Sequence, residues 1–299
     1  WERFGYYLMI GIFTLYLKDV EAGFAMTEKE ASDLYGTFIA LVFLTPFIGG
    51  LVADRYLGYK KSIVLGGLMM GAGYFMMGIH DIVMLYVAMT LVIVGNGFFK
   101  PNISTLLGNF YNDDQYKEKK DEGYNIFYMG INLGAFLGQT ICPYLGDEVV
   151  NGVQNVHAFK WGFLAASIAM FIGTIIFLLL KNKYVVTPEG VAIGGKPKAS
   201  DIPEGESDQA KFSTTSIIIS GVLAVALTYG LHLVMGGPGV SPIKSWLYPF
   251  IFAAGIALGY LIISDKTITK VERDRIWVLY IVCFFVMFFW GAFEQAGSS

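Results

Sequence analysis

Four charged side chains lie inside long apolar stretches of this sequence: Glu2, Arg3, Lys100 and Glu294. Two are acidic and two are basic, so they can neutralise one another. A carboxylate that alternately pairs with a cation and takes up a proton can couple proton movement to another event. In a membrane, a charge at the centre of a helix costs at least about 2.5–3.5 kcal/mol, and such residues usually line a path for substrate, ions or protons.

Lys100 is the only charged residue between positions 83 and 107, and Pro101 follows it directly. About 17 residues, or about 25 Å of helix, precede it. Two interpretations follow: Lys100 faces an aqueous cavity, or it extends its amine to the cytoplasmic interface. The largely apolar residues that come after it favour the cavity.

Spacing does not decide whether Glu2 and Arg3 are buried, because they stand at the start of the sequence. Glu294 follows an apolar run that begins at Trp277, and we expect it in the far half of its helix.

Polar aromatic and amide side chains share helix faces with these charges. Arg3, Tyr6 and Tyr7 are spaced i, i+3 and i+4, and Tyr128 precedes Asn132 by four residues, so each set lies on one helix face. An interfacial anchor would also explain the first set. Together with the charges, the two sets predict a wet cavity that can hold a zwitterion.

The elements that must position these residues are apolar helices. Hydrophobic residues make up 55% of the 299 and charged residues 15%, against about 25% charged in soluble domains. A helix needs about 20 apolar residues to cross a bilayer. Nine segments are expected to do so: residues 1–17, 34–53, 62–79, 83–107, 124–145, 161–180, 216–235, 246–263 and 277–297. Since nothing alternates with the period of a strand, the sequence predicts an all-α polytopic membrane protein.

Basic residues are distributed unequally between the loops. Four lie on one side (Lys18, Lys29, Lys160 and Lys244) and fifteen on the other; Arg3 and Lys100 complete the 21. Cytoplasmic loops are enriched in lysine and arginine. We therefore expect the loop between the second and third helices, and the N-terminus, to be cytoplasmic.

The segments group into four regions. Residues 1–180 form an N-terminal six-helix bundle and residues 181–215, polar and with three prolines, a flexible cytoplasmic linker. An inserted helix pair, 216–264, and one further helix, 265–299, follow. We interpret the chain as part of a longer polypeptide.

Glycines repeat at four-residue spacing on two of the helices. Gly130, Gly134 and Gly138 do so on the fifth helix, and Gly67 and Gly71 on the third. This spacing lets backbones approach closely and predicts tight helix packing.

Several function classes lack support in the sequence. A net charge of −3 does not suggest nucleic acid as a partner, and the two cysteines and three histidines form no metal-ligand pattern. No nucleophile–base pair indicates an enzyme, and no cofactor is expected apart from protons as coupling ion.

Residues 49–61, between the second and third helices, resemble the signature loop of the major facilitator superfamily. Four further stretches look like the proton-dependent oligopeptide transporter family: residues 2–7 (Glu-Arg-Phe-Gly-Tyr-Tyr), 95–105 (with Lys100-Pro-Asn), 127–134 and 289–298. The resemblance spans the whole chain, in the family's order of helices. The pair at 216–264 is similar to the insertion that separates the two six-helix bundles of bacterial members.

The resemblance implies a symporter that imports di- and tripeptides with protons by alternating access, in a bacterial inner membrane. It assigns proton coupling to Glu2, Arg3 and Glu294. It assigns peptide binding to Arg3, Tyr6, Tyr7, Lys100, Tyr128, Asn132 and Trp290. The loop residues Gly50, Asp54, Arg55, Gly58 and Lys60 take a structural or gating role.

The sequence departs from the family pattern in three ways. A tyrosine that is common on the second helix is Phe43 here, and a further glutamate of the family's first helix would precede Trp1. The last five helices are also not in the chain. A carrier of another anion, such as nitrate or a carboxylate, and a non-transporting fragment are the alternatives.

Overall fold

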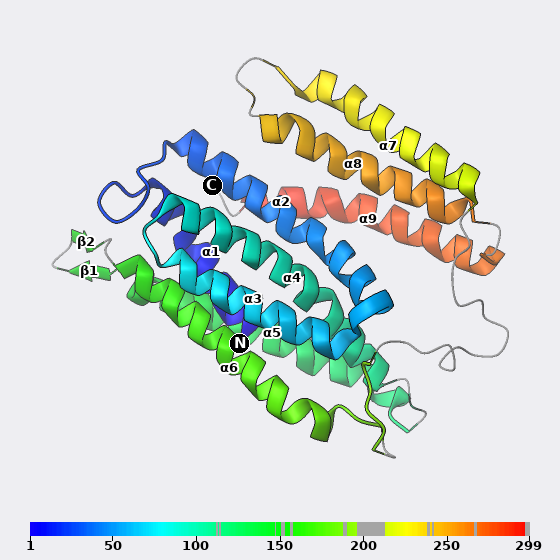
Figure 1. The fold of residues 1–299 in the computed structure, drawn as a ribbon, viewed down its shortest axis with the longest axis horizontal. Coiled ribbons are helices and arrows are strands. Elements are labelled where there is room, and N and C mark those ends of the chain that lie inside the picture. Colours follow the sequence, from blue (N-terminus) through cyan, green and yellow to red (C-terminus); the bar gives the residue numbers. More distant parts are fainter. Residues whose placement is uncertain are drawn as a thin grey trace. The chain divides into compact units, whose positions relative to one another are not determined.

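The computed structural model describes residues 1–111, 113, 115–146, 148–150, 153–155, 158–187, 190–195, 213–237, 240, 242–265 and 268–296. Of these, the side chains of 146, 148–150, 153–155, 242, 243 and 290–296 lie outside the description. Helices dominate the described residues (Figure 1), and the chain divides into two compact units, residues 1–198 and 199–299.

The first unit contains six long helices: α1 (Glu2–Lys18), α2 (Glu28–Val52), α3 (Tyr59–Met77), α4 (Ile82–Phe110), α5 (Lys120–Gly146) and α6 (Phe159–Tyr184). Helix α3 packs against α4 and α6, α2 packs against α4, and α1 packs against α5 and α6. Two short strands, β1 (Glu148–Val150) and β2 (Val153–Asn155), pair antiparallel between α5 and α6. The sequence did not predict this hairpin.

The second unit contains α7 (Thr214–Met235), α8 (Pro242–Ile263) and α9 (Lys270–Ala296). Helix α7 packs along α8, where the Ser220 hydroxyl donates a hydrogen bond to the Ala257 carbonyl at 2.7 Å. The Tyr280 hydroxyl on α9 donates to the Gly255 carbonyl on α8 at 3.2 Å.

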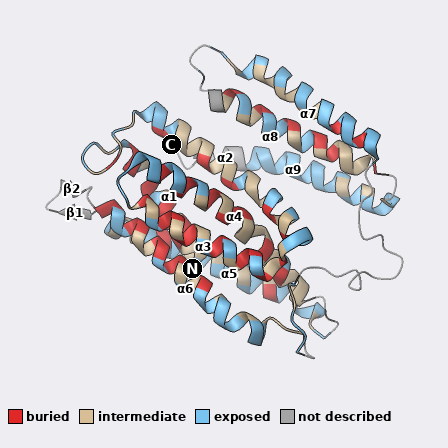
Figure 2. Ribbon diagram, viewed as in Figure 1, coloured by how far each residue is buried: buried red, intermediate tan, exposed pale blue. Residues whose placement is uncertain are grey.

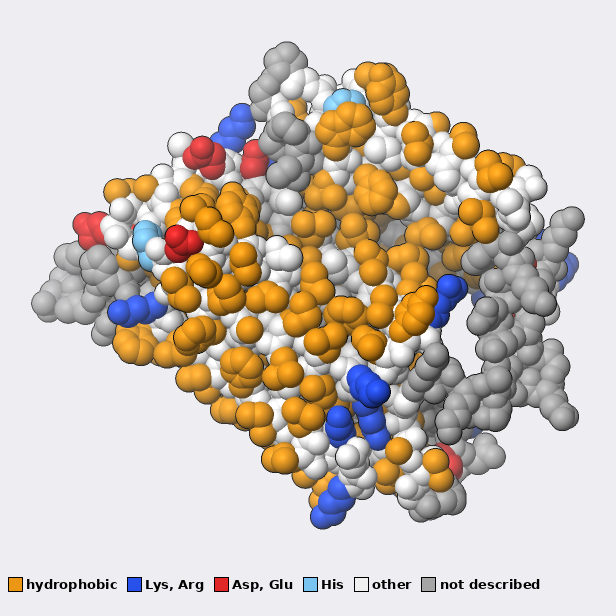
Figure 3. Space-filling model, in the orientation of Figure 1, with side chains coloured by type: hydrophobic (Ala, Val, Ile, Leu, Met, Phe, Trp, Pro, Cys, Tyr) orange, Lys and Arg blue, Asp and Glu red, His pale blue; other side chains and the backbone are white. Residues whose placement is uncertain are grey.

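Each of the nine expected segments is helical in the structure, which confirms the all-α fold class. Five helices are long and apolar enough to cross a membrane by length and composition: Glu28–Leu57, Ile82–Phe110, Phe159–Tyr184, Thr214–Met235 and Lys244–Ile263. Helix α1 has 17 residues, at the lower end of the range that can cross a bilayer. Hydrophobic side chains are spread over much of the face drawn in Figure 3, as expected for a surface against lipid.

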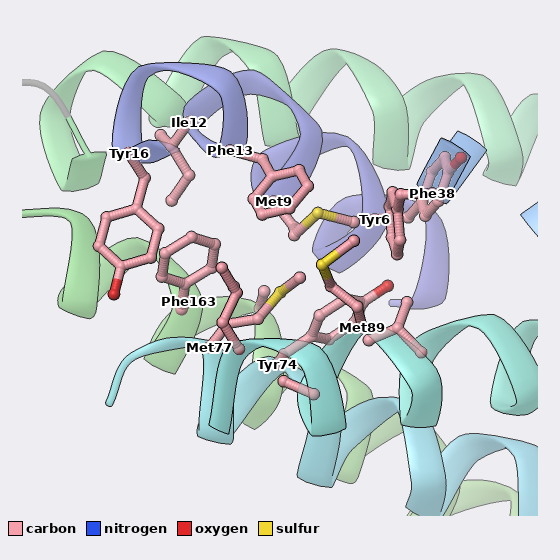
Figure 4. Close-up of a cluster of buried hydrophobic side chains, with 14 of the residues drawn as sticks. Tyr6, Met9, Ile12, Phe13, Tyr16, Phe38, Tyr74, Met77, Met89 and Phe163 are labelled. Atoms are coloured by element: carbon pink, nitrogen blue, oxygen red, sulfur yellow. The ribbon is translucent and has the colours of Figure 1, made fainter. Parts of the chain in front are cut away.

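The core of the first unit lies around α1 (Figure 2). Met9, Phe13 and their neighbours on α1 meet Phe38 of α2, Met77 of α3 and Phe163 of α6 (Figure 4). These side chains are almost completely buried. Helix α1 is therefore held on several sides, which fixes the position of its first turn.

Local sequence sets where several helices begin. Thr27 and Glu30 form a capping box at the start of α2, and the Asp81 carboxylate accepts a hydrogen bond from the Met84 amide at 2.8 Å at the start of α4. At the start of α9 the Thr269 amide and hydroxyl both donate to Glu272. These bonds lower the pKa of Glu272, which lies outside the apolar stretch at 277–297.

The repeated glycines allow close helix contacts, with one exception. A Cβ at Gly67 would meet Thr174 of α6, and at Gly138 it would lie 2.7 Å from the Phe4 carbonyl oxygen of α1. In the same way, a Cβ at Gly71 would meet the ring of Phe171, and one at Gly134 would meet the side chain of Arg3. Gly130 has open space instead, so the packing expected there is absent: it borders a cavity.

Side chains of neighbouring helices satisfy carbonyl groups that prolines leave unpaired. Pro46 of α2 has no N–H to donate to the Val42 carbonyl, and Asn96 Nδ2 of α4 donates to that oxygen at 2.8 Å. In α8, Pro249 frees the Ser245 carbonyl in the same way, and Nδ1 of His232 lies 2.8 Å from it.

The segment expected as a loop at 49–61 is mostly helical. Helix α2 continues to Val52, one turn of π-helix covers Ala53–Leu57 with Asp54 and Arg55, and Gly58 (φ 76°) ends it. Gly50 lies inside α2, where its missing side chain faces Pro101. Within residues 49–61, Gly58 alone has the positive φ that glycine tolerates.

The expected flexible linker at 181–215 begins with ordered structure. Helix α6 extends to Tyr184, and backbone hydrogen bonds then join Val185 to Ile193 and Thr187 to Val191. Lys60, which is buried, donates its ammonium to the Val185 carbonyl at 2.8 Å and its amide to the Gly194 carbonyl at 3.0 Å. The first part of the linker is therefore fixed to the start of α3; residues 196–212 lie outside the described residues.

Candidate functional site

A cavity of about 490 Å³ lies in the first unit, among α1, α3, α4, α5 and α6. Most of its wall is apolar, but Glu2, Arg3, Lys100 and Tyr128 also line it. Three of the four charges found inside apolar segments therefore meet at one cavity, although α1 and α4 are far apart in sequence. An apolar cavity with a few converging polar groups is typical of a small-molecule site.

Glu2 and Arg3 form an ion pair in the first turn of α1. The Arg3 Nε lies 3.2 Å from Glu2 Oε2, and the two side chains are only 17% and 10% exposed. Glu2 Oε1 is buried and has no hydrogen-bond partner among the residues that the structure describes. One oxygen of this carboxylate is therefore committed to Arg3, and the other is left for a proton or for solvent.

Lys100 is half-buried and interacts electrostatically with both Glu2 and Arg3. Its place on the cavity wall agrees with the first of the two interpretations, a lysine that faces a cavity. One negative and two positive charges give the group a formal net charge of +1. An anionic group on a ligand would balance that charge.

Close contacts between helices fix the part of α4 that carries Lys100. A Cβ at Gly95 would lie 2.8 Å from the Gly66 carbonyl oxygen of α3, and one at Gly97 would lie 2.9 Å from the Thr45 carbonyl oxygen of α2. The Thr45 hydroxyl also donates to the Ile93 carbonyl at 2.8 Å. The glycines before Lys100 thus allow α4 to contact two helices at backbone distance.

The remaining predicted ligand residues of the first unit are not on the cavity wall. Tyr6 is 6% exposed in the apolar core, with Arg3 above its ring at 5.8 Å and the Tyr7 ring at 5.7 Å. Tyr7 packs against the same core. Asn132 is exposed, one turn beyond Tyr128, and does not line the cavity. Of the phenols and amides expected around a wet cavity, the structure brings only Tyr128 to this one.

Trp290 and Glu294 lie on α9, in the second unit. Their side chains are outside the described residues, and their roles stay predictions. The same holds for the gating role of Gly50, Asp54, Arg55, Gly58 and Lys60, whose surroundings are described above.

Sequence reasoning missed Tyr74 of α3. Its side chain is fully buried, and its hydroxyl finds no hydrogen-bond partner within the described part of the chain. It interacts electrostatically with Glu2, Tyr6 and Arg3, and its ring lies 3.5 Å from the Cβ position of Gly5. A polar side chain in the middle of an apolar, glycine-rich helix was the signal that could have revealed it.

Within the described ranges, no group of three His, Cys, Asp or Glu side chains is placed to hold a metal ion.

Long apolar helices around a partly charged cavity define an integral membrane protein. The POT family model matches residues 60–299, and the chain belongs to that family.

Relatives and solved structures agree with this assignment. The chain is 31% identical over 306 residues to the uncharacterized transporter YclF of Bacillus subtilis (strain 168), covering all of this chain and 56% of YclF. It is 30% identical over 307 residues to a di-/tripeptide transporter of Lactococcus lactis subsp. cremoris, covering 57% of that protein. A POT family transporter crystallised with a thioalcohol-conjugated peptide matches with a TM-score of 0.70 and 26% identity, over 99% of this chain and 57% of that one.

The chain thus spans about half the length of the curated relatives it matches. The similar proteins are transporters by name, so the family is one of transporters rather than of enzymes.

Proposed function

We propose that the full-length protein is a symporter that imports di- and tripeptides together with protons by alternating access. The observation that carries this proposal is the meeting of Glu2, Arg3 and Lys100 at one cavity. Relatives named as di-/tripeptide transporters support the substrate class. Protons serve as the coupling ion and no other cofactor is involved.

The coupling step follows from the ion pair. With Glu2 ionised, Arg3 is held by its neighbour. A proton on Glu2 neutralises the carboxylate and releases Arg3, which then pairs with the peptide carboxylate alongside Lys100. Leaving a buried charge without its partner costs about 3–5 kcal/mol, so protonation and carboxylate binding favour each other.

Three further residues complete the proposal. Tyr128, on the cavity wall, contacts the peptide. Trp290 is a further peptide contact and Glu294 a second proton-coupling carboxylate. The protein is located in a bacterial inner membrane with its N-terminus in the cytoplasm.

Uptake in liposomes tests the proposal. Full-length protein should accumulate dialanine when given an inward proton gradient or an inside-negative potential. Uptake that is absent, or indifferent to both, would contradict symport. Uptake of nitrate or a simple carboxylate in place of dialanine would favour the anion carrier.

A substitution at Glu2 tests the coupling step. Glu2→Gln imitates the protonated carboxyl and should abolish gradient-driven uptake while counterflow exchange of dialanine continues. Glu118→Gln, an exposed acid between α4 and α5, is the matched control and should behave as wild type. Driven uptake that survives Glu2→Gln would limit Glu2 to a structural role.

A further inference from the structure

Lys100 has an aromatic partner in addition to the charges around it. Its ammonium nitrogen lies 4.5 Å from the centre of the Phe43 ring, across the α2–α4 contact. This is well inside the distance of about 6 Å at which a cation is attracted to the face of a ring. Phe43 stands where the family commonly has a tyrosine, so a ring face is present at this position without a hydroxyl.

The contact is built into a fixed part of the bundle. The carbonyl of Val42, next to Phe43, accepts the hydrogen bond from Asn96, and the Thr45 hydroxyl bonds to the Ile93 carbonyl. Gly97 allows α4 to meet Thr45 at backbone distance. Helix α2 can therefore not shift along α4 without breaking these bonds, and the ring stays beside Lys100.

The geometry also leaves the ammonium accessible. Lys100 lines the charged cavity, whereas Phe43 is not among the cavity's lining residues. Lys100 therefore belongs to the cavity wall, and its aromatic partner lies outside that wall. Since Glu2 attracts Lys100 and Arg3 repels it, the ring also opposes movement of the lysine onto Glu2, where its ammonium would be paired before a ligand binds.

We propose that Phe43 is a positioning residue that holds the Lys100 ammonium at the cavity wall, ready for the carboxylate of a ligand. A lysine has a flexible stem and loses rotamer freedom when its ammonium is fixed. With the Phe43 ring present, part of the rotamer freedom of Lys100 is lost before the ligand binds, so less of this entropy cost reduces the binding affinity. The identity of the ligand group, a carboxylate, rests on the proposed function. The contact between Lys100 and Phe43 is independent of that function.

The contact itself is tested by NMR on the full-length protein. Reductive methylation with ¹³C-formaldehyde labels lysines and keeps their charge; the Lys100 signal is the one lost in Lys100→Arg. Because the Lys100 ammonium lies over the Phe43 ring, its methyl resonance should be shifted upfield by the ring current. This upfield shift should disappear in Phe43→Met and persist in Phe43→Tyr. Phe47→Met, at an exposed phenylalanine one turn along α2, should keep it. An unshifted signal, or a shift that survives Phe43→Met, would overturn the proposal.

Positioning is tested by binding of dialanine and of its carboxy-terminal amide. Phe43→Met should weaken dialanine binding about two- to fivefold, the factor that an exposed cation–π contact supplies, and Phe43→Tyr should not. The amide should bind equally to all variants. Equal or tighter dialanine binding in Phe43→Met would overturn the positioning role. If wild type bound no dialanine at all, the proposed function would fail, and the NMR result would still decide the contact.

Discussion

Tyr74 is the residue whose surroundings are hardest to reconcile with a purely structural role. A buried hydroxyl without a partner costs about 1–3 kcal/mol, and Tyr74 has no hydrogen-bond partner among the described residues. Glu2, with which it interacts, also carries a buried oxygen without one. Two such atoms from α1 and α3 create a polar spot inside an otherwise apolar core.

Tyr74→Phe should therefore raise the thermal stability of the detergent-solubilised protein. The change removes an unsatisfied polar atom and keeps the ring that fills the core. The measurement is the midpoint of thermal unfolding. Tyr16→Phe, another core tyrosine, gives the comparison, since its hydroxyl is not among the buried groups without a partner. A fall in the midpoint for Tyr74→Phe would mean that its hydroxyl forms a hydrogen bond through an internal water.

Among the helices, the contact between α2 and α4 has the most specific chemistry. Pro46 frees the Val42 carbonyl, and Asn96 supplies a hydrogen bond from the next helix. Water cannot satisfy that carbonyl in a membrane core, so the hydrogen bond from Asn96 is needed there. This bond joins α2 to α4 one turn before Lys100.

Asn96→Ala should destabilise the protein by about 1–3 kcal/mol, because the Val42 carbonyl is left unsatisfied. In a Pro46→Ala background the same change should cost less, since an alanine in place of the proline restores the N–H that bonds to Val42 within α2. Thermal unfolding of the four proteins gives the double-mutant cycle.

Thr90→Ala is the control for this cycle. Among the described residues, the Thr90 hydroxyl bonds to the Tyr86 carbonyl of its own helix and to no other helix, so its loss should leave the stability nearly unchanged. Equal penalties for Asn96→Ala in both backgrounds would show that Asn96 acts independently of the proline.

For the whole molecule, the distribution of lysine and arginine predicts the orientation in the membrane. Fifteen basic residues fall in one set of loops and four in the other, and this bias predicts which loops face the cytoplasm.

Cysteine accessibility in intact cells checks the orientation. In a full-length protein whose Cys142 and Cys283 are replaced by serine, Lys29→Cys should react with a membrane-impermeant maleimide and Lys119→Cys should not. Both positions are exposed. After cell lysis, Lys119→Cys should become reactive. The reverse pattern would contradict a cytoplasmic N-terminus.

Helix positions could be predicted well because each apolar stretch is set by local composition, and several helix starts, such as those of α2 and α4, are set by a nearby cap. The linker was predicted less well. The prolines and charges of the linker suggested flexibility. In the structure, Lys60 donates hydrogen bonds to backbone carbonyl groups of the linker's first residues. Side-chain composition cannot predict such bonds, because every residue has a backbone carbonyl group.

The sequence alone determined that Lys100, Glu2 and Arg3 are exceptional, because a charge in an apolar helix is costly whatever the fold. Only the tertiary structure decided that these three meet at one cavity, that Tyr6 belongs to the core instead, and that Phe43 and Tyr74 belong to the site's surroundings. Contacts between α1, α2, α3 and α4 join residues tens of positions apart. The periodicity of one helix shows which side chains share a face, but not which helix that face will meet.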